Sequence, residues 1–425
     1  MSFDAPIQPQ RIAIIGGGIS GLAAAYEMSP HHAITLYEAA PTLGGHARTV
    51  IAGKRGDQPV DTGFIVFNYA NYPHLTAMFR DLNVPVERSD MSFGATIDGG
   101  AVEYGLQGLR ALIGQRRNLL RPGFYRMVRD IMRFNARAEA AARDDDMSIG
   151  DLLDQLGLGD WFVRYYLLPI SGAIWSTPPE DIRDFPARAL VQFFRNHALL
   201  STSGQHQWWT VKGGSIQYIN RLERHLEARA CILHRDCPVT SVARGPEGVT
   251  IRAQGRAAEV FDQVIFACHS DEALRLLDAP APDEAAALSA IRYQDNHMVL
   301  HCDAGQMPKR RDCWSSWVYK ADSRDARGAI GVTYWMNKLQ NIPLDDPLFV
   351  TLNPATPIAA DKIYDQKLFR HPVFDGPALR AQKQLTALQG RDRLWFAGAY
   401  TRHGFHEDGY ASAVRIARAM ARQPV

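Results

Sequence analysis

The chain has 425 residues, of which 46% are hydrophobic, so it can bury a large core and its length predicts two or three domains. The formal net charge of +2 is too small to indicate nucleic-acid binding, and the five cysteines show neither a Cys-x-x-Cys pair nor metal-ligand spacing with histidine. We therefore expect no nucleic-acid partner, no metal site, and reduced thiols in a cytoplasmic protein. We also expect neither an export signal nor a transmembrane helix, since no apolar run approaches about 18 residues.

Residues 11–38 follow the pattern of a dinucleotide-binding unit. An apolar strand runs into Gly16-x-Gly18-x-x-Gly21, a helix of small residues, and a second strand that ends before Glu38. Gly16 allows a tight turn, Gly18 lets a pyrophosphate approach the backbone, and Gly21 lets the helix pack closely on the sheet. The helix N-terminus offers N–H groups and a positive dipole to the phosphates. A carboxylate at Glu38 accepts from a ribose 2′-hydroxyl and repels a 2′-phosphate, which predicts FAD or NAD rather than NADP.

The segment after this unit resembles a known family. It reads Gly44-Gly45-His46-Ala47-Arg48 and is followed by Val60-Asp61-Thr62-Gly63-Phe64. An acid that ends the second strand, then a Gly-Gly pair and a basic residue, is similar to the start of the flavin-containing amine oxidase and phytoene desaturase superfamily. The resemblance implies that this segment, including Gly44, Gly45, Arg48 and Gly63, lies beside the pyrophosphate and flavin of FAD. His46 stands where the family usually has arginine, so either His46 or Arg48 is the partner of the phosphates.

Two later segments resemble the other pieces from which this superfamily assembles its FAD site. In the middle piece, the backbone of Val239 would meet the adenine. In the closing piece, a strand ending near Gly398 is followed by a loop and a helix whose N-terminus would stabilise negative charge on reduced flavin. Ala399 stands where the family usually has an acid, so the carboxylate that holds a ribityl hydroxyl is missing or supplied by another residue. No cysteine follows residue 313, which favours non-covalent FAD. The contacts that this resemblance implies for the closing piece are Gly398, Gly409, Tyr410 and Ala411.

The implied fold class is α/β, with a Rossmann-like FAD-binding domain of the glutathione-reductase-like, amine oxidase type and an α+β substrate domain. No second glycine triplet follows a strand, so we expect no separate nicotinamide site. The FAD-binding domain would comprise residues 1–70, 205–270 and 391–425, and the substrate domain residues 71–204 and 271–390.

The two insertions differ in pattern. Apolar residues recur at three- and four-residue steps over residues 124–138, which predicts a helix. Alternating and aromatic stretches at residues 297–301, 314–319 and 331–335 predict strands of an antiparallel sheet.

The first insertion also contains an arginine-rich stretch with interspersed bulky apolar residues. Such a stretch can lie in a membrane interface, here at the inner face of the membrane, attracted by anionic head groups. The alternative is the solvated face of a domain helix. The arginines are Arg110, Arg116, Arg117, Arg121, Arg126, Arg129, Arg133 and Arg137.

Several segments are most similar to a bacterial branch of predicted NAD/FAD-binding proteins. That branch is similar to the flavoprotein part of plant cyclopropane fatty acid synthases and to desaturases of the furan fatty acid pathway. The resemblance implies a lipid substrate, from whose methyl-branched unsaturated acyl chain a hydride passes to flavin N5 to form a conjugated diene. The similar segments are residues 60–68, 116–122, 173–178, 371–374 and 404–409.

The catalytic candidates lie in the closing piece. His406 and Glu407 are candidate proton acceptors, with the alternative that Glu407 and Asp408 cap the last helix. Tyr410 matches one wall of the aromatic cage of amine oxidases and could equally pack an acyl chain. Five aromatic residues either line a substrate tunnel or pack in the core. These are Trp175, Trp208, Trp209, Tyr334 and Trp335.

Two other functions remain open. An amine oxidase would oxidise a C–N bond and release peroxide, and Lys338 is the lysine best placed in the sequence to hold a water near flavin N5. A non-catalytic flavoprotein would instead serve as the partner of a lipid methyltransferase.

Overall fold

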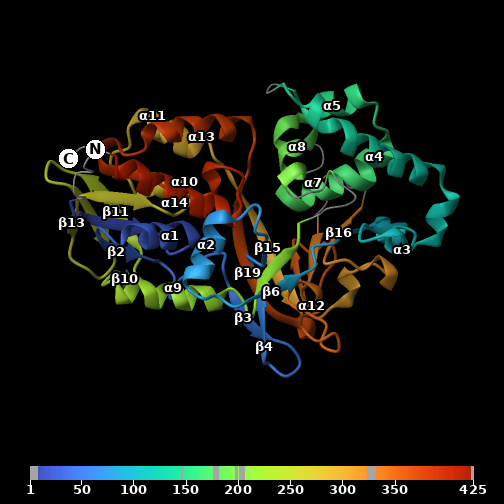
Figure 1. Ribbon diagram of the computed structural model, residues 1–425, viewed down its shortest axis with the longest axis horizontal. Helices are drawn as coiled ribbons and strands as arrows, with labels where there is room; N and C mark the ends of the chain where they lie inside the picture. Colours follow the sequence, from blue (N-terminus) through green and yellow to red (C-terminus); the bar gives the residue numbers. More distant parts are fainter. Residues whose placement is uncertain are drawn as a thin grey trace, which may run out of the picture.

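The computed structural model describes residues 8–144, 147–175, 181–196, 200, 206–322 and 331–422. These residues form a nucleotide-binding lobe and a second lobe that combines a large sheet with a helical region (Figure 1). The predicted combination of an α/β nucleotide-binding fold and an α+β domain is confirmed.

A five-stranded parallel sheet forms the centre of the nucleotide-binding lobe. Its strand order is β10-β2-β1-β14-β20, and Ile14 of the central strand lies opposite both Leu36 and Ile265. The central strand is apolar because the sheet is covered on both faces. The predicted glycine-rich unit therefore starts at the middle of the sheet. The strands are β1 (Arg11–Ile15), β2 (Ala33–Tyr37), β10 (Ile232–His234), β14 (Gln263–Phe266) and β20 (Leu394–Phe396).

Alternate residues of β1 enter two separate cores, as the period-two geometry of a strand requires. Ile12 and Ile14 pack with helices on one face of the sheet, and Ala13 and Ile15 pack with a small antiparallel sheet and further helices on the other. The first face carries α1 (Ile19–Met28), α2 (Pro73–Asp81), α9 (Ile216–Ala228) and α14 (His406–Met420). The second carries β11 (Val239–Arg244), β12 (Val249–Ala253), β13 (Glu259–Phe261), α10 (Ser270–Leu276), α11 (Pro282–Ser289) and α13 (Gly376–Leu388).

Four of these helices differ from the predicted domain boundaries. Helices α2, α11 and α13, and α10 from its second residue onward, lie within residues assigned to the substrate domain, yet their apolar residues pack in the two cores of the nucleotide-binding lobe. Residue ranges near the insertions therefore do not follow the packing, because a helix joins the lobe on which it buries its apolar face.

A seven-stranded mixed sheet dominates the second lobe, in the order β19-β15-β18-β17-β16-β7-β8. The predicted antiparallel pairing of the aromatic strands is present between β16 and β17. Strand β7, from the first insertion, pairs with β16 in parallel and so joins the two insertions in one sheet. The strands are β7 (Phe93–Ile97), β8 (Val102–Gly105), β15 (Tyr293–His301), β16 (Trp317–Ala321), β17 (Gly331–Trp335), β18 (Phe349–Leu352) and β19 (Ile363–Pro372).

A helical region lies beyond this sheet, at the end of the molecule away from the nucleotide-binding lobe (Figure 1). The predicted helix over residues 124–138 is confirmed as α4, which buries Phe124, Met127, Phe134 and Ala138. The region contains α3 (Leu109–Leu112), the 3₁₀ helix η2 (Arg116–Leu120), α4 (Pro122–Ala141), α5 (Ile149–Leu156), α6 (Asp160–Phe162), α7 (Leu168–Trp175) and α8 (Ala187–Asn196).

The remaining elements connect the lobes. The short strands form a two-stranded sheet, β3-β4, and a three-stranded sheet, β5-β9-β6. The connecting elements are β3 (Thr49–Ala52), β4 (Gln58–Asp61), β5 (Val66–Phe67), β6 (Val86–Ser89), β9 (Trp208–Val211) and α12 (Met336–Leu339).

Within the described ranges, no helix is both long and apolar enough to cross a membrane.

Candidate cofactor and substrate cavity

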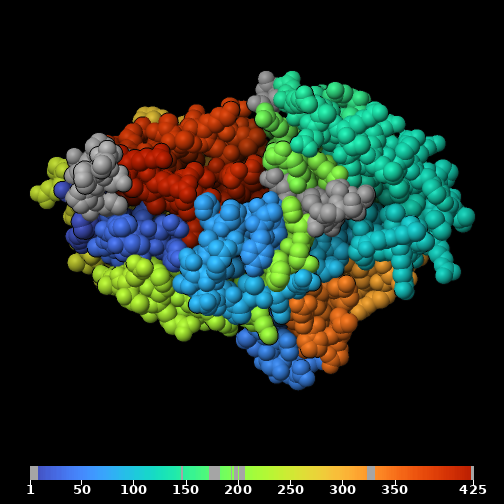
Figure 2. All heavy atoms as spheres, viewed as in Figure 1, coloured from blue at the N-terminus to red at the C-terminus, as the bar shows by residue number. Residues whose placement is uncertain are grey.

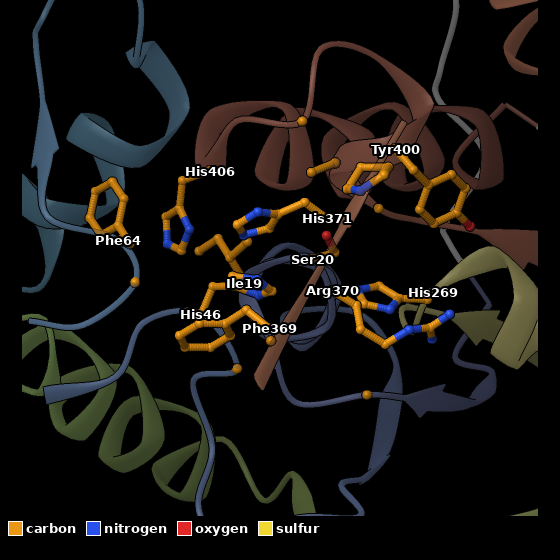
Figure 3. Close-up of a pocket in the computed structure, with 18 of the residues that line it drawn as sticks. Ile19, Ser20, His46, Phe64, His269, Phe369, Arg370, His371, Tyr400 and His406 are labelled. Carbon is orange, nitrogen blue, oxygen red and sulfur yellow. The ribbon is translucent and has the colours of Figure 1, made fainter. Parts of the chain in front are cut away.

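A cavity of about 730 Å³ lies where the nucleotide-binding lobe meets the seven-stranded sheet. This volume is within the range of small-molecule and cofactor sites. All three predicted pieces of the cofactor site contribute to its wall, together with β19 of the second lobe (Figure 3). Of the predicted cofactor residues, the wall includes Gly16, Gly18, Glu38, Gly45, His46, Gly63, Val239 and Gly398.

The glycine-rich turn forms one end of the cavity. A Cβ atom on Gly16, whose φ is +111°, would lie 2.8 Å from the carbonyl oxygen of Ala267, and a Cβ on Gly21 would lie 1.9 Å from the carbonyl oxygen of Gly16. These two glycines are therefore required by packing. A Cβ on Gly18 would meet no atom within 4 Å, so this backbone is open to a ligand at the N-terminus of α1.

Glu38 follows β2 and is fixed by backbone hydrogen bonds. Its carboxylate accepts from the N–H of Gly17 at 2.5 Å and from the N–H of Ala40 at 2.7 Å. The side chain also lines the cavity beside the glycine turn. Its position fits the predicted hydrogen bond to a ribose hydroxyl.

The two candidate phosphate partners in the loop after Glu38, His46 and Arg48, have different surroundings. Gly44 donates to the carbonyl of Gly17 at 2.8 Å, which ties the loop to the glycine turn. His46 lines the cavity, and its buried Nε2 has no hydrogen-bond partner among the described residues. Arg48 instead turns to the second lobe, where it forms an ion pair with Asp365 at 2.5 Å. His46, not Arg48, is therefore the residue of this loop that can meet a bound cofactor.

Gly63 holds this loop close to the next strand. A Cβ on Gly63 would lie 2.1 Å from the carbonyl oxygen of His46, which accepts a hydrogen bond from the N–H of Phe64 at 2.7 Å. The ring of Phe64 stacks on His406, with 3.9 Å between ring centroids and 11° between planes. Gly63 thus permits the contact that places both rings at the cavity.

The middle and closing pieces meet at the other strands of the central sheet. Val239 lines the cavity at the start of β11, and Cys268 and His269 line it after β14. Burial raises the pKa of the Cys268 thiol, which disfavours a nucleophilic thiolate. Gly398 donates to Ser412 Oγ at 2.9 Å and lies at the wall with Ala399, so no carboxylate stands at the position where the family usually has one.

Glu407, one of the two candidate proton acceptors, does not line the cavity. Its carboxylate accepts from the N–H groups of His74 at 2.9 Å and Leu75 at 3.0 Å, at the N-terminus of α2. Burial raises the pKa of Glu407 to about 7 against these hydrogen bonds. Asp408 provides the predicted cap of the last helix, α14, by accepting from the N–H of Phe405 at 3.0 Å. Glu407 instead caps α2.

Tyr410 and its neighbours also lie away from the cavity, so the structure does not bring Tyr410 to the substrate wall predicted for it. Its hydroxyl donates to Glu27 at 3.0 Å and its ring packs in the core. Gly409 and Ala411 are buried but do not line the cavity. A Cβ on Gly409 would lie 2.8 Å from Ser20 Oγ, so this glycine allows α14 to approach α1.

His406 is the catalytic candidate that does line the cavity, at the first residue of α14. Its Nε2 lies 2.7 Å from the hydroxyl of Tyr218, and its ring lies on Phe64. Burial lowers the pKa of His406 to about 3, so the imidazole is neutral near pH 7.

Three further histidines line the cavity with His406, namely His46, His269 and His371, and of these only His46 was predicted from the sequence. His371 Nδ1 lies 3.1 Å from Asn296 Nδ2, and burial, with the nearby His269, lowers the pKa of His371 to about 4. Burial also lowers the pKa values of His46 and His269. The four histidines are spread from position 46 to position 406 of the sequence, so no local motif could have grouped them. His371 does lie in one of the segments that carried the family resemblance.

An apolar wall forms the second-lobe side of the cavity. Trp317, Tyr334 and Val350 lie side by side on neighbouring strands β16, β17 and β18 and all line the cavity. Further apolar lining residues of the cavity include Ile65, Met91, Trp208, Leu339, Leu352 and Phe369. The acids of the cavity wall, Glu38 and Glu272, both belong to the nucleotide-binding lobe.

The structure thus divides the predicted tunnel residues. Trp208 and Tyr334 line the cavity, but Trp209 contacts Tyr69 and Trp335 packs against Trp314 in a separate core. The side chain of Trp175 lies outside the described residues. Lys338 does not line the cavity, and its Nζ lies 3.8 Å from Asp90. Among the residues the structure describes, no group of three or more metal-ligating side chains is found.

A glycine-lined cradle, an acid after β2 and an adjoining apolar wall are the features of a dinucleotide-binding protein with room for a second, apolar ligand. The chain matches the model of the family described as flavin containing amine oxidoreductase over residues 19–302. It is similar to human protoporphyrinogen oxidase, with 24% identity over 358 residues that cover 71% of this chain and 70% of the human protein. It is also similar to the "Probable zeta-carotene desaturase" of Synechococcus elongatus, with 22% identity over 370 residues, 82% of this chain and 75% of that protein.

Solved structures share the fold at low sequence identity. The CLA-producing fatty acid isomerase from P. acnes has a TM-score of 0.67 at 17% identity, covering 96% of this chain and 98% of that chain. Wild-type putrescine oxidase bound to putrescine has a TM-score of 0.66 at 15% identity, covering 97% and 98%. The chain belongs to the flavin-containing amine oxidoreductase family. It is therefore a flavin-dependent oxidoreductase whose cofactor is FAD, as the sequence predicts.

Proposed function

We propose that the protein is a desaturase that oxidises a methyl-branched unsaturated fatty acyl chain of a phospholipid to a conjugated diene, with non-covalently bound FAD. The observation that carries this proposal is the apolar row Trp317, Tyr334 and Val350 on the cavity wall opposite the nucleotide-binding lobe. A wall of this kind holds a hydrocarbon chain by burial of apolar surface and excludes water. The names of two similar proteins, a carotene desaturase and a fatty acid isomerase, agree with an apolar unsaturated substrate.

The cavity residues have two tasks in this reaction. Oxidised FAD supplies a two-electron acceptor that takes a hydride. The apolar wall must position an allylic C–H group, because the adjacent double bond lowers the barrier to hydride loss. The neighbouring proton must then leave, and the His406 imidazole can accept it at Nδ1 if its Nε2–H donates to the Tyr218 hydroxyl 2.7 Å away.

A weak base is sufficient for this proton transfer. Loss of a hydride makes the adjacent C–H group of the substrate strongly acidic, so a buried imidazole with a pKa of about 3 can accept its proton. Phe64, stacked on His406 at 3.9 Å, holds the ring in one orientation. His371, also neutral, offers its Nε2–H as a donor because the Asn296 amide occupies its Nδ1.

The structure favours this reading over the two alternatives. An amine oxidase that uses Lys338 would need this side chain in the cavity, whereas the side chain pairs with Asp90. The apolar side of the cavity also presents no acid for a substrate ammonium group among its lining residues. A non-catalytic partner of a lipid methyltransferase has no observation in its favour.

Anaerobic mixing of the yellow protein with possible substrates tests the proposal. One set of samples receives phospholipids with methyl-branched unsaturated chains, and the other receives a panel of amines, while loss of the oxidised-flavin absorbance is followed. Bleaching by the lipids, with a diene detected by mass spectrometry, would support the desaturase. Bleaching by amines alone would establish an amine oxidase, and no bleaching by either would favour the non-catalytic partner.

A further inference from the structure

Large apolar side chains are exposed in the helical region, far more densely than elsewhere. Twelve such side chains are exposed among the described residues, and five of them lie within residues 109–132. The exposed fractions reach 84% for Leu120 and 72% for Leu109. The five are Leu109, Leu119, Leu120, Tyr125 and Met132. They occupy the outer side of α3, η2 and α4, since α4 buries its other face in the core.

The same segment concentrates positive charge. Residues 109–141 contain eight arginines and two acids, so the remainder of the chain has a net negative charge. One of the two acids, Asp130, is buried and pairs with Arg129. Four arginines form no ion pair with any described residue, namely Arg116, Arg117, Arg126 and Arg137, and all four are exposed.

The other arginines of the segment have structural partners. Arg110 pairs with Asp312, Arg121 donates to the carbonyl of Ala101, and Arg133 donates to the carbonyls at the end of α5. These contacts hold the segment on the protein. The unpaired arginines and the exposed leucines are therefore surplus to what the fold needs.

The two kinds of side chain share one surface. Tyr125, Arg129 and Met132 follow one another at three- and four-residue steps along α4, so they form a single stripe, with Arg126 and Arg137 beside it. Residues 105–144, coloured teal, lie at the right-hand end of the molecule in the space-filling view (Figure 2). A solvated helix face would not expose this much leucine, and a symmetric contact between two copies would bring the arginines of both together.

We propose that the exposed residues of α3, η2 and α4, here named the docking face, bind the surface of a membrane that contains anionic phospholipids. Leu109, Leu119, Leu120 and Met132 enter the boundary between head groups and acyl chains, and the unpaired arginines attract the phosphates. The proposed contact is with the membrane surface, because its residues are exposed on the outside of α3, η2 and α4. The proposal does not depend on which compound reduces the flavin.

Co-sedimentation of the flavin-loaded protein with vesicles tests the docking face. Phosphatidylcholine vesicles with and without phosphatidylglycerol are compared at low and high salt. We expect binding to the anionic vesicles, little binding to pure phosphatidylcholine, and weaker binding at high salt, because surface charges are screened. The paired variants L119S/L120S and R116E/R117E should each bind at least about tenfold more weakly.

Two matched controls separate this face from general surface effects. Leu344→Ser removes another leucine that is 64% exposed, and Arg55→Glu reverses an exposed arginine elsewhere. Both controls should bind like the wild type, and all variants should keep their flavin and melting temperature because the changed side chains are exposed. The proposal is overturned if the wild type stays in the supernatant with anionic vesicles at low salt, or if both paired variants bind normally. A wild-type dimer that L119S/L120S converts to a monomer, with no vesicle binding, would show a self-association face and would also overturn it.

Discussion

The carboxylate of Glu407, in the first turn of α14, accepts a hydrogen bond from the backbone N–H of His74 at 2.9 Å, in the first turn of α2. A second bond from Leu75 at 3.0 Å completes the contact. A residue that the sequence suggests for proton transfer thus joins two helices of the nucleotide-binding lobe.

Glu407→Ala should therefore reduce stability and leave chemistry intact. The change leaves two N–H groups of α2, one buried and one partly buried, without an acceptor, which costs about 1–3 kcal/mol. Urea unfolding measures this loss, with Glu247→Ala, at an exposed glutamate, as the control. The rate of flavin reduction per folded protein should equal that of the wild type. A large loss of rate in a variant of normal stability would show that Glu407 takes part in the reaction.

His406→Ala should slow flavin reduction by the lipid substrate by about 10²–10⁴-fold, the range for a general base. Stopped-flow absorbance under anaerobic conditions measures the rate. Because the pKa of His406 is about 3, the wild-type rate should show no inflection from this group between pH 5 and 8. His297→Ala, at an exposed histidine, serves as the control. An unchanged rate in His406→Ala would exclude it as the base.

Gly18→Ala and Gly21→Ala should fail in different ways. The added Cβ at Gly21 would overlap the carbonyl oxygen of Gly16, so this variant should not fold. The added Cβ at Gly18 meets free space, so this variant should fold but contain less flavin, since the methyl group keeps the pyrophosphate from the backbone. Melting curves and flavin content of the purified proteins distinguish the two. Full flavin content in Gly18→Ala would contradict this role of the turn.

His46→Ala should affect cofactor binding, whereas Arg48→Ala should affect the packing of the two lobes. His46 faces the cavity with an unpartnered Nε2, so its removal should weaken flavin retention during dialysis. Arg48 pairs with Asp365 of the second lobe, so its removal should lower stability and spare the flavin. Flavin release and urea unfolding of both variants check this division. The reverse pattern would assign the phosphates to Arg48.

His371→Gln should make the protein less sensitive to acid. The folded pKa of about 4 lies below the ordinary value of 6.5, so the folded state binds fewer protons than the unfolded state between these values. The contribution of neutral His371 to the free energy of unfolding is complete above pH 6.5 and is lost as the pH falls toward 4. Between pH 7 and pH 5 the loss should be about 2 kcal/mol greater for the wild type than for the variant. Urea unfolding at both pH values measures it, and equal losses would contradict the burial of a neutral His371.

The sequence by itself determined the nucleotide-binding unit, because its requirements are local. The turn at Gly16, the close packing at Gly21 and the acid at Glu38 depend on spacing within one strand–helix–strand unit. The helix over residues 124–138 follows from its apolar period in the same way. The order of the three pieces then indicated the superfamily.

Only the tertiary structure decided which neighbouring residues face the cavity. His406 lines it, whereas Glu407 and Tyr410 lie one turn apart on a face of α14 that packs against other helices. The sequence alone cannot set this helical phase, because it depends on where α1 and α2 lie.

The sequence alone could not predict the long-range contacts either. His46 rather than Arg48 meets the cavity because Asp365, 317 residues away along the chain, pairs with Arg48. The parallel pairing of β7 with β16 joins the two insertions, and the cavity brings together four histidines from separate parts of the chain. Such contacts depend on the three-dimensional packing of segments that no local pattern connects.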